Sequence, residues 1–260
     1  MSMRLFRVGV AAACALLPLS VRGESAGALL LSDDFAQRPP GLISNAFAYH
    51  HPSDPQARKD TIWEVTAGSF FADRGSGFSG VPDSVQPNAL STNGSGSAML
   101  RVRSQRANFN NVSVSFDLQT VAFFDHTGIA PNGHDGVGAV LREKSTSEFY
   151  VALANSRDDN AAIVKLMPGK GPNGIRATEL ATAHFPTRRN AVQHVQVSVQ
   201  TLRDGSVLLV LMVDGERVAR ARDDGRIGGP PIFGDGRIGF YGDNAEFYVR
   251  RFALHDLPTH

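Results

Sequence analysis

The sequence of 260 residues carries 26 Lys and Arg against 25 Asp and Glu, so its net charge is close to zero. Without an excess or a stripe of basic residues, the chain is not expected to bind nucleic acid. Its one cysteine, Cys14, lies near the N-terminus, so the rest of the chain forms no disulfide and must be stabilised by a hydrophobic core.

Residues 1–23 have the pattern of a secretory signal peptide. Arg4 and Arg7 precede an apolar run at 8–19 that is too short to span a bilayer, and the end of the segment favours cleavage before Glu24. A lipid anchor on Cys14 is the weaker alternative, because no Leu or Val stands three residues before it. We therefore expect a secreted, monomeric protein without membrane insertion, in which residues 24–260 form a single domain.

The first part of this domain is expected to contain short strands and two long loops. A strand at 29–35 is followed by the polar, proline-rich segment 36–60, which is expected to be a wrapping loop. A hairpin is expected next, with strands 63–66 and 69–72 joined at Ala67-Gly68. The second long loop is expected at 73–97. Loops of this length inside a compact domain often form the rim of a binding site.

From residue 98 onward, apolar and polar residues alternate as in half-buried strands. Strands are expected at 98–103, 112–119, 136–142, 148–154, 162–167 and 179–183. In the C-terminal third, Asp204-Gly205 and Asp214-Gly215 are expected to join strands as hairpins, because Asp-Gly favours the type I′ turn. With a last strand at 246–254 and no convincing helix, the pattern predicts an all-β, two-sheet antiparallel sandwich.

The order of several short motifs resembles the concanavalin A-like lectin/glucanase superfamily, and within it secreted bacterial laminin-G-like or family-16-like modules. The motifs are Ser32-Asp33-Asp34-Phe35, Trp63-Glu64-Val65, the strand 108–116, the strand 136–142, Phe149-Tyr150-Val151 and the closing segment 236–241. The resemblance implies a jelly roll that binds or cleaves polysaccharides on a concave sheet, so a polysaccharide or another glycan is the expected ligand. Fold alone does not determine function.

The glucanases of this superfamily carry acidic residues in a Glu-x-Asp-x-x-Glu-like strand, and no strand here has that motif. A retaining hydrolase needs two carboxyl groups about 5 Å apart, so the absence of this acidic motif disfavours retaining hydrolysis. Non-catalytic carbohydrate binding is therefore the leading hypothesis. The alternatives are a polysaccharide lyase or an atypical glycoside hydrolase, and a laminin-G-like protein-interaction module.

A lyase needs an arginine to neutralise a uronate and a Tyr or His to move protons. The candidates are Arg142, Tyr150 and His134, with Asp135 as the carboxylate that orients the histidine. In the strand at 148–154, the bulky Phe149 side is expected to face the core, which would place Tyr150 and its small neighbours on the floor of a groove. The expected ligand-binding residues are Arg142, Tyr150, Lys165, Asn155, His134 and Asp135.

Other aromatic and polar residues could bind sugars by ring stacking and paired hydrogen bonds. These are Tyr49, His50, His51, Trp63 and Asp159, of which Trp63 is expected to lie in the core between Ile62 and Val65.

Superfamily members often hold a structural ion near the place where the first and last strands meet. Asp33, Asp34 and Asp243 lie at those two ends of the chain and could supply oxygen ligands to Ca²⁺. Aspartate is also favoured in tight turns for backbone reasons, which is the alternative explanation. The resemblance thus suggests a structural calcium ion held by these three residues.

Overall fold

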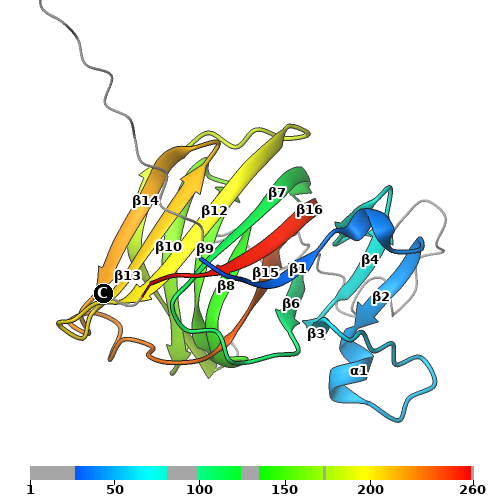
Figure 1. Cartoon of the computed structure of the whole chain (residues 1–260), viewed down its shortest axis with the longest axis horizontal. Helices are drawn as coiled ribbons and strands as arrows, with labels where there is room; N and C mark the ends of the chain where they lie inside the picture. Colours follow the sequence, from blue (N-terminus) through cyan, green and yellow to red (C-terminus); the bar gives the residue numbers. More distant parts are fainter. Residues whose placement is uncertain (1–26, 81–98, 124–134, 172–173, 259–260) are drawn as a thin grey trace, which may run out of the picture.

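A computed structural model describes residues 27–80, 99–123, 135–171 and 174–258. The predicted signal segment and its cleavage site lie outside these residues. Two antiparallel sheets stack face to face, and β7, β12 and β16 of the first sheet lie in front of the second sheet in Figure 1. In the described part of the chain, no helix is long and apolar enough to cross a membrane.

The first sheet has the order β14 (Glu216–Asp223), β13 (Val207–Val213), β12 (Val192–Thr201), β7 (Val112–Phe123), β16 (Ala245–Asp256), β5 (Ser76–Phe78), β4 (Ser69–Asp73) and β2 (Gly41–Asn45). The strand β1 (Leu29–Asp33) pairs with β16. The second sheet has the order β11 (Ile175–His184), β10 (Asn160–Pro168), β9 (Glu148–Ser156), β8 (Gly136–Ser145), β15 (Arg237–Asp243), β6 (Leu100–Ser104) and β3 (Trp63–Ala67). A short 3₁₀ turn, η1 (Phe35–Gln37), and one short helix, α1 (Ala46–His50), complete the described elements.

The main core fills the space between the sheets. In β12, Val195, Val197 and Val199 are fully buried while His194 points outward, as the two-residue alternation predicts. Trp63 is also fully buried, which confirms its expected place in the core. Its ring centroid lies 5.0 Å from that of Phe252 in an edge-to-face contact, one of several such contacts in an aromatic cluster.

The Asp-Gly hairpins are confirmed in the first sheet, where they join β12 to β13 and β13 to β14. Asp214 and Gly215 have φ values of 52° and 82°, as a type I′ turn requires. The connection from β12 to β13 is instead a longer loop, in which Gly205 has a φ of 77° and Asp204 has no positive φ. Positive φ at both central residues of a two-residue turn matches the right-handed twist of the flanking strands. These turns bring the three strands into one meander.

The structure differs from the sequence-based expectation before residue 73. The expected hairpin at Ala67-Gly68 is wrong, because β3 belongs to the second sheet and β4 to the first. The expected loop at 36–60 contains β2 and α1. One side chain organises much of this segment: the Asn45 carbonyl oxygen accepts from Ala48 N and Arg58 N, and its amide donates to Gln56 O. A polar residue thus caps the helix and pins the following loop.

The two faces of β9 are both buried, but in different clusters. Tyr150, Ala152 and Ala154 belong to the main core between the sheets. Phe149, Val151 and Leu153 belong to a second apolar cluster on the other face of the same sheet. The prediction that Tyr150 lies on the floor of an open groove is therefore wrong, because the Tyr150 side, and not the Phe149 side, faces the main core. The small alanines fit between two closely packed sheets, and the tyrosine hydroxyl finds buried hydrogen-bond partners there.

Candidate functional site

The side chain of Arg142 is fully buried at a bulge of β8, where its φ is 50°. Its guanidinium donates to Asn110 O, Ile232 O, Asn111 Oδ1 and Thr201 Oγ1 at 2.9 to 3.2 Å. Burial lowers the pKa of this group to about 10. The arginine therefore joins β8 to the residues just before β7, the end of β12 and the segment before β15, and it is not accessible to a polysaccharide.

Tyr150 and Lys165 meet at Asp223, which lies on the first sheet. The Tyr150 hydroxyl donates to Asp223 Oδ2 at 2.7 Å and accepts from Ile232 N at 2.9 Å. Lys165 Nζ donates to both carboxylate oxygens, at 2.8 and 2.9 Å, and to Gly229 O at 2.7 Å. Burial, together with the hydrogen bond to Asp223, raises the pKa of Tyr150. These groups form a polar junction inside the core rather than the floor of a groove.

The remaining predicted ligand-binding residues are also placed away from an open surface, or lie beyond the described residues. Asn155 is fully buried and donates to Thr120 Oγ1 and Gln193 Oε1. Asp135 is fully buried and accepts from Arg157 and Asn244. His134 lies outside the described residues. The predicted lyase trio is therefore not observed as an accessible site.

The three predicted calcium ligands do not come together. The strands β1 and β16 do pair, and Asp33 lies opposite Phe252. Asp243, however, precedes the other end of β16, about 20 Å away at a strand rise of about 3.3 Å per residue. Asp33 accepts from Arg38 and from Trp63 Nε1, and Asp34 caps the 3₁₀ turn. Among the described residues no group of three or more His, Cys, Asp or Glu residues is placed to hold a metal ion.

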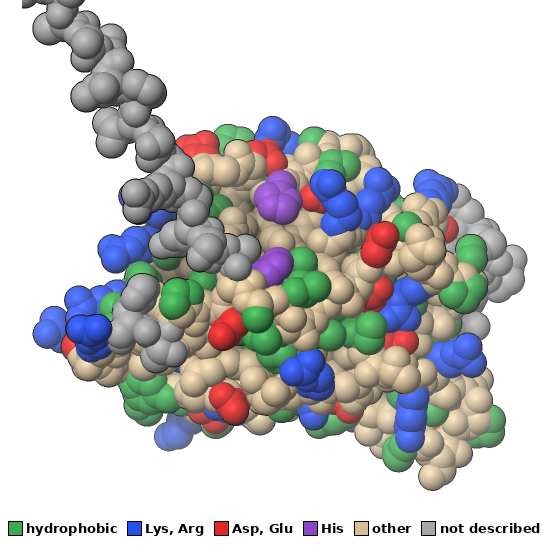
Figure 2. All heavy atoms as spheres, viewed as in Figure 1, with side chains coloured by type: hydrophobic (Ala, Val, Ile, Leu, Met, Phe, Trp, Pro, Cys, Tyr) green, Lys and Arg blue, Asp and Glu red, His purple; other side chains and the backbone are tan. Residues whose placement is uncertain are grey.

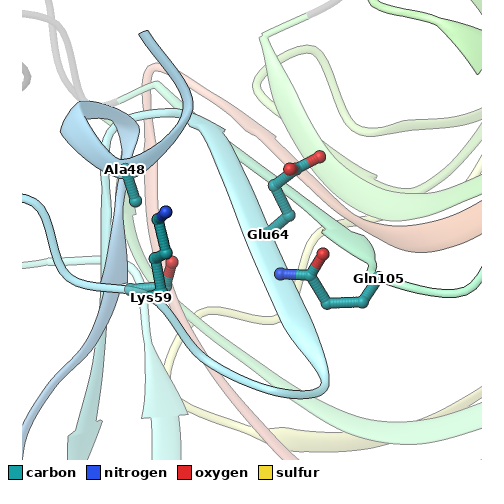
Figure 3. Close-up of a pocket in the computed structure, with 5 residues that line it drawn as sticks. Ala48, Lys59, Glu64 and Gln105 are labelled. Atoms are coloured by element: carbon teal, nitrogen blue, oxygen red, sulfur yellow. The ribbon is translucent and has the colours of Figure 1, made fainter. Parts of the chain in front are cut away.

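A pocket of about 220 Å³ lies between α1, the segment 51–62 and β3, and we call it the α1–β3 pocket. Figure 3 shows Lys59 reaching toward Ala48 of α1, with Glu64 rising from β3 and the Gln105 amide directed toward the same space. The residues that line it are Ser44, Ala48, Lys59, Glu64 and Gln105. Four of these five side chains are polar, so the pocket suits a hydroxyl-rich ligand.

The wall of the α1–β3 pocket is held by a network centred on Asp60. Asp60 Oδ1 accepts from Ile62 N and Trp63 N, and its carboxylate pairs with Arg38. Burial would raise the pKa of Asp60, but the hydrogen bonds from Arg38 and the backbone outweigh it and the pKa is lowered. Arg38 also pairs with Asp33, which accepts from the buried indole of Trp63. The segment before β3 is thereby fixed to the core.

Beside the pocket, Arg103 lies between two carboxylates. Its Nε donates to Glu64 Oε2 at 2.7 Å and its NH1 donates to Glu143 Oε1 at 2.8 Å. Burial raises the pKa of Glu143 in spite of this ion pair. A retaining or inverting hydrolase needs the space between its two carboxyl groups for the substrate. Here the guanidinium occupies that space, so the pair is not arranged for hydrolysis.

The ring of Tyr49 adds an aromatic surface to this region. The Arg103 guanidinium carbon lies 5.0 Å from the ring centroid, and Tyr49 is 38% exposed. One part of the ring thus packs on a cation while another part is open to solvent. Sugar-binding sites combine such a ring with polar groups that bind hydroxyls. Glu64 Oε1 and the Gln105 carbonyl oxygen can accept, and the Lys59 ammonium can donate.

Sequence reasoning named Tyr49 as a sugar-binding candidate but missed Lys59, Glu64, Arg103 and Gln105. A signal for Glu64 was present, since alternation with buried Trp63 and Val65 places it on the opposite face of the strand. No local sequence pattern predicts that Lys59 and Gln105 line the same pocket, because this depends on how β3 and β6 pair. The site is a product of tertiary structure.

Comparison with known proteins supports the fold. No known family and no curated protein matches the sequence. Among solved structures, the potassium-bound carbohydrate recognition domain of Emp46p matches with a TM-score of 0.50 at 12% identity, over 83% of this chain and 96% of that one. The carbohydrate-binding module CBM66 from Bacillus subtilis matches with a TM-score of 0.46 at 14% identity, over 75% of this chain and 96% of that one. The alginate lyase Aly36B matches with a TM-score of 0.44 at 9% identity, over 88% of this chain and 98% of that one.

These identities are low, so the similarity concerns the fold alone. The two stacked antiparallel sheets and the likeness to lectin-type domains show that the chain has the concanavalin A-like jelly-roll fold. This confirms the fold class predicted from the sequence.

Proposed function

We propose that this protein is a secreted, non-catalytic carbohydrate-binding protein that holds a sugar unit of a polysaccharide in the α1–β3 pocket. The observation that carries the proposal is the exposed ring of Tyr49 beside a small pocket lined by polar side chains. At about 220 Å³ the pocket is smaller than the sites of about 300–1,000 Å³ that hold drug-sized ligands, so it suits a single sugar unit.

Two further observations support this function. The solved structure that shares the fold with a TM-score of 0.50 is a carbohydrate recognition domain, which makes a glycan the natural ligand class to test. The pattern of residues 1–23 supports export, and extracellular or periplasmic polysaccharides would then be available.

Binding without catalysis is favoured over a lyase or a hydrolase. Arg142 and Tyr150 are used inside the core, and their polar atoms are bonded to protein groups. Glu64 and Glu143 both bond to Arg103, which fills the space that a scissile bond would need. The accessible groups of the α1–β3 pocket can bind hydroxyls, and a binding role requires only that.

A glycan array with the purified protein, followed by titration of the best-bound polysaccharide, tests this proposal. We expect Tyr49→Ala to weaken binding by about tenfold or more, which corresponds to about 1.4 kcal/mol. Phe233→Ala is the matched control, because Phe233 is a similarly exposed aromatic residue, 44% against 38%, on the segment between β14 and β15. Both variants should melt like the wild type. Equal affinities for Tyr49→Ala and the wild type, or no binding to any glycan, would refute the proposal.

A further inference from the structure

The edge strand β14 carries a row of arginines on the outer face of the first sheet. Ala219, Ala221 and Asp223 are buried, so Arg220 and Arg222 between them point outward. Arg217 is paired across the sheet with Met212, whose neighbours Leu211 and Val213 are buried, so Arg217 shares the outer face. Figure 2 shows Lys and Arg side chains at the left margin of the molecule, where Figure 1 places β14.

Two of these arginines have no ionic partner in the part of the chain that the structure describes. Arg222 pairs with Asp204 on the neighbouring turn. For Arg217 and Arg220, by contrast, the described residues provide no hydrogen-bond or ion-pair partner, and both are exposed. Arginine presents a planar fork of donors that matches carboxylate and sulfate oxygens. The row therefore offers free cationic donors on a rigid, hydrogen-bonded strand.

The neighbouring strands continue this row in register. Met212, Val210 and Leu208 of β13 lie opposite Arg217, Arg220 and Arg222, in that order. On the next strand, Gln196, Ser198 and Gln200 of β12 lie opposite the same three β13 residues. Across the three strands, each arginine of β14 is thus followed by a half-buried aliphatic side chain of β13 and then by an amide or hydroxyl of β12, with neighbouring strands about 4.8 Å apart. We call these three rows the β12–β14 face.

We propose that the β12–β14 face is a binding surface for an extended acidic polysaccharide. Its carboxylates or sulfates would bind the arginines, its hydroxyls would bind the amides and hydroxyls of β12, and its C–H faces would pack on the aliphatic row between them. The face lies at the β14 edge of the first sheet, whereas the α1–β3 pocket lies at the β2 edge. The inference therefore goes beyond the proposed pocket and does not depend on it.

Charged side chains on an edge strand also prevent edge-to-edge association of sheets. That role explains why charge is present on β14, but it does not require the two further rows to be matched in register. A lipid surface fits less well, because the aliphatic residues of the face are half-buried and form no protruding apolar tip. The chemistry favours a flat, hydroxyl-rich polyanion.

Binding of the purified protein to sodium alginate, to neutral dextran of similar length and to anionic phospholipid vesicles tests this inference. We expect alginate to bind most tightly, with an affinity that falls as salt rises. Arg217→Gln/Arg220→Gln should lower the alginate affinity at least tenfold. Arg226→Gln/Lys170→Gln removes two exposed cations elsewhere and should change it less than about threefold, because long-range charge effects are screened.

The same measurements separate this face from the α1–β3 pocket. Tyr49→Ala should leave alginate binding unchanged if the β12–β14 face is the site. Three results would overturn the inference. These are an equal loss of alginate affinity in Arg217→Gln/Arg220→Gln and in Arg226→Gln/Lys170→Gln, equal binding of alginate and dextran, or tighter binding to vesicles than to alginate. Loss of alginate binding in Tyr49→Ala alone would also overturn it, while supporting the pocket.

Discussion

At the scale of single residues, Arg142 is a fully buried charged side chain that is held by several hydrogen-bond partners. Among the described residues no carboxylate bonds to the Arg142 guanidinium, which donates instead to four neutral oxygen atoms. Such a group costs free energy to bury and is tolerated only where its hydrogen bonds are made. Removing it would leave those oxygens without their donor in a dry environment. Its role is therefore structural.

We expect Arg142→Ala to destabilise the protein by about 3–5 kcal/mol, because the change opens a cavity and strips four buried oxygens of their donor. Chemical denaturation of the variant and the wild type measures this difference. Arg226→Ala, at a position 87% exposed in its side chain, is the control and should shift stability by about 0.5 kcal/mol or less. A similar small shift for both variants would show that Arg142 is not a structural residue.

At the scale of elements, ion pairs connect neighbouring strands and the segment before them. Arg103 of β6 links Glu64 of β3 to Glu143 of β8 across one face of the second sheet. Asp60 links the loop before β3 to Arg38. The two acids respond differently to folding: the pKa of Glu143 is raised by burial, while that of Asp60 is lowered by its hydrogen bonds in spite of burial. Their contributions to stability should therefore change with pH in opposite directions.

We predict opposite pH profiles for two neutral variants. Glu143 has a folded-state pKa above its ordinary value of 4.5, so the wild type loses stability as pH rises past that value, and Glu143→Gln should gain relative to it. Asp60 has a folded-state pKa below its ordinary value of 3.8, so its stabilisation is present above that value and is lost at lower pH. Asp60→Asn should therefore be less stable than the wild type near neutral pH and approach it in acid.

Urea denaturation between about pH 3 and about pH 7 would measure both differences on the same scale. Each variant serves as the control for the other, since a general effect of removing a carboxylate would move both in the same direction. Parallel profiles would contradict the assignment of burial to one acid and hydrogen bonding to the other.

At the scale of the whole molecule, a buried ion pair ties the two sheets together. Lys165 belongs to β10 of the second sheet and Asp223 to β14 of the first, and both side chains are fully buried. Asp223 also accepts from Tyr150, whose hydroxyl in turn accepts from Ile232 N. A buried pair contributes little net stability when compared with apolar residues, but breaking it leaves one charge unpaired.

We expect Lys165→Met to cost about 3–5 kcal/mol, because it leaves the Asp223 carboxylate buried without its cation. The double variant Lys165→Met/Asp223→Leu should cost less than the sum of the two single changes by at least about 1 kcal/mol, which denaturation of all four proteins would show. Additive losses would mean that the two side chains do not interact across the sheets.

Local sequence patterns determined the strands and several of the turns of this protein. Alternation of apolar and polar residues identifies β7 and β12, and Asp-Gly identifies the turn between β13 and β14, because side-chain alternation and positive φ are properties of a few adjacent residues. The same local signals, in their order along the chain, were enough to predict a two-sheet sandwich, and the resemblance of several short motifs to a known superfamily specified a jelly roll.

Only the tertiary structure decided which face of a strand is buried between the sheets and which residues meet at a site. Strand β9 is apolar on both sides, so its own sequence cannot assign Tyr150 to the main core and Phe149 to the other face. Lys165 and Asp223 are 58 positions apart, and Arg142 and Ile232 are 90 apart. The α1–β3 pocket likewise needs Gln105 to lie against the loop before β3. Such pairings depend on sheet order and packing, which no local pattern encodes.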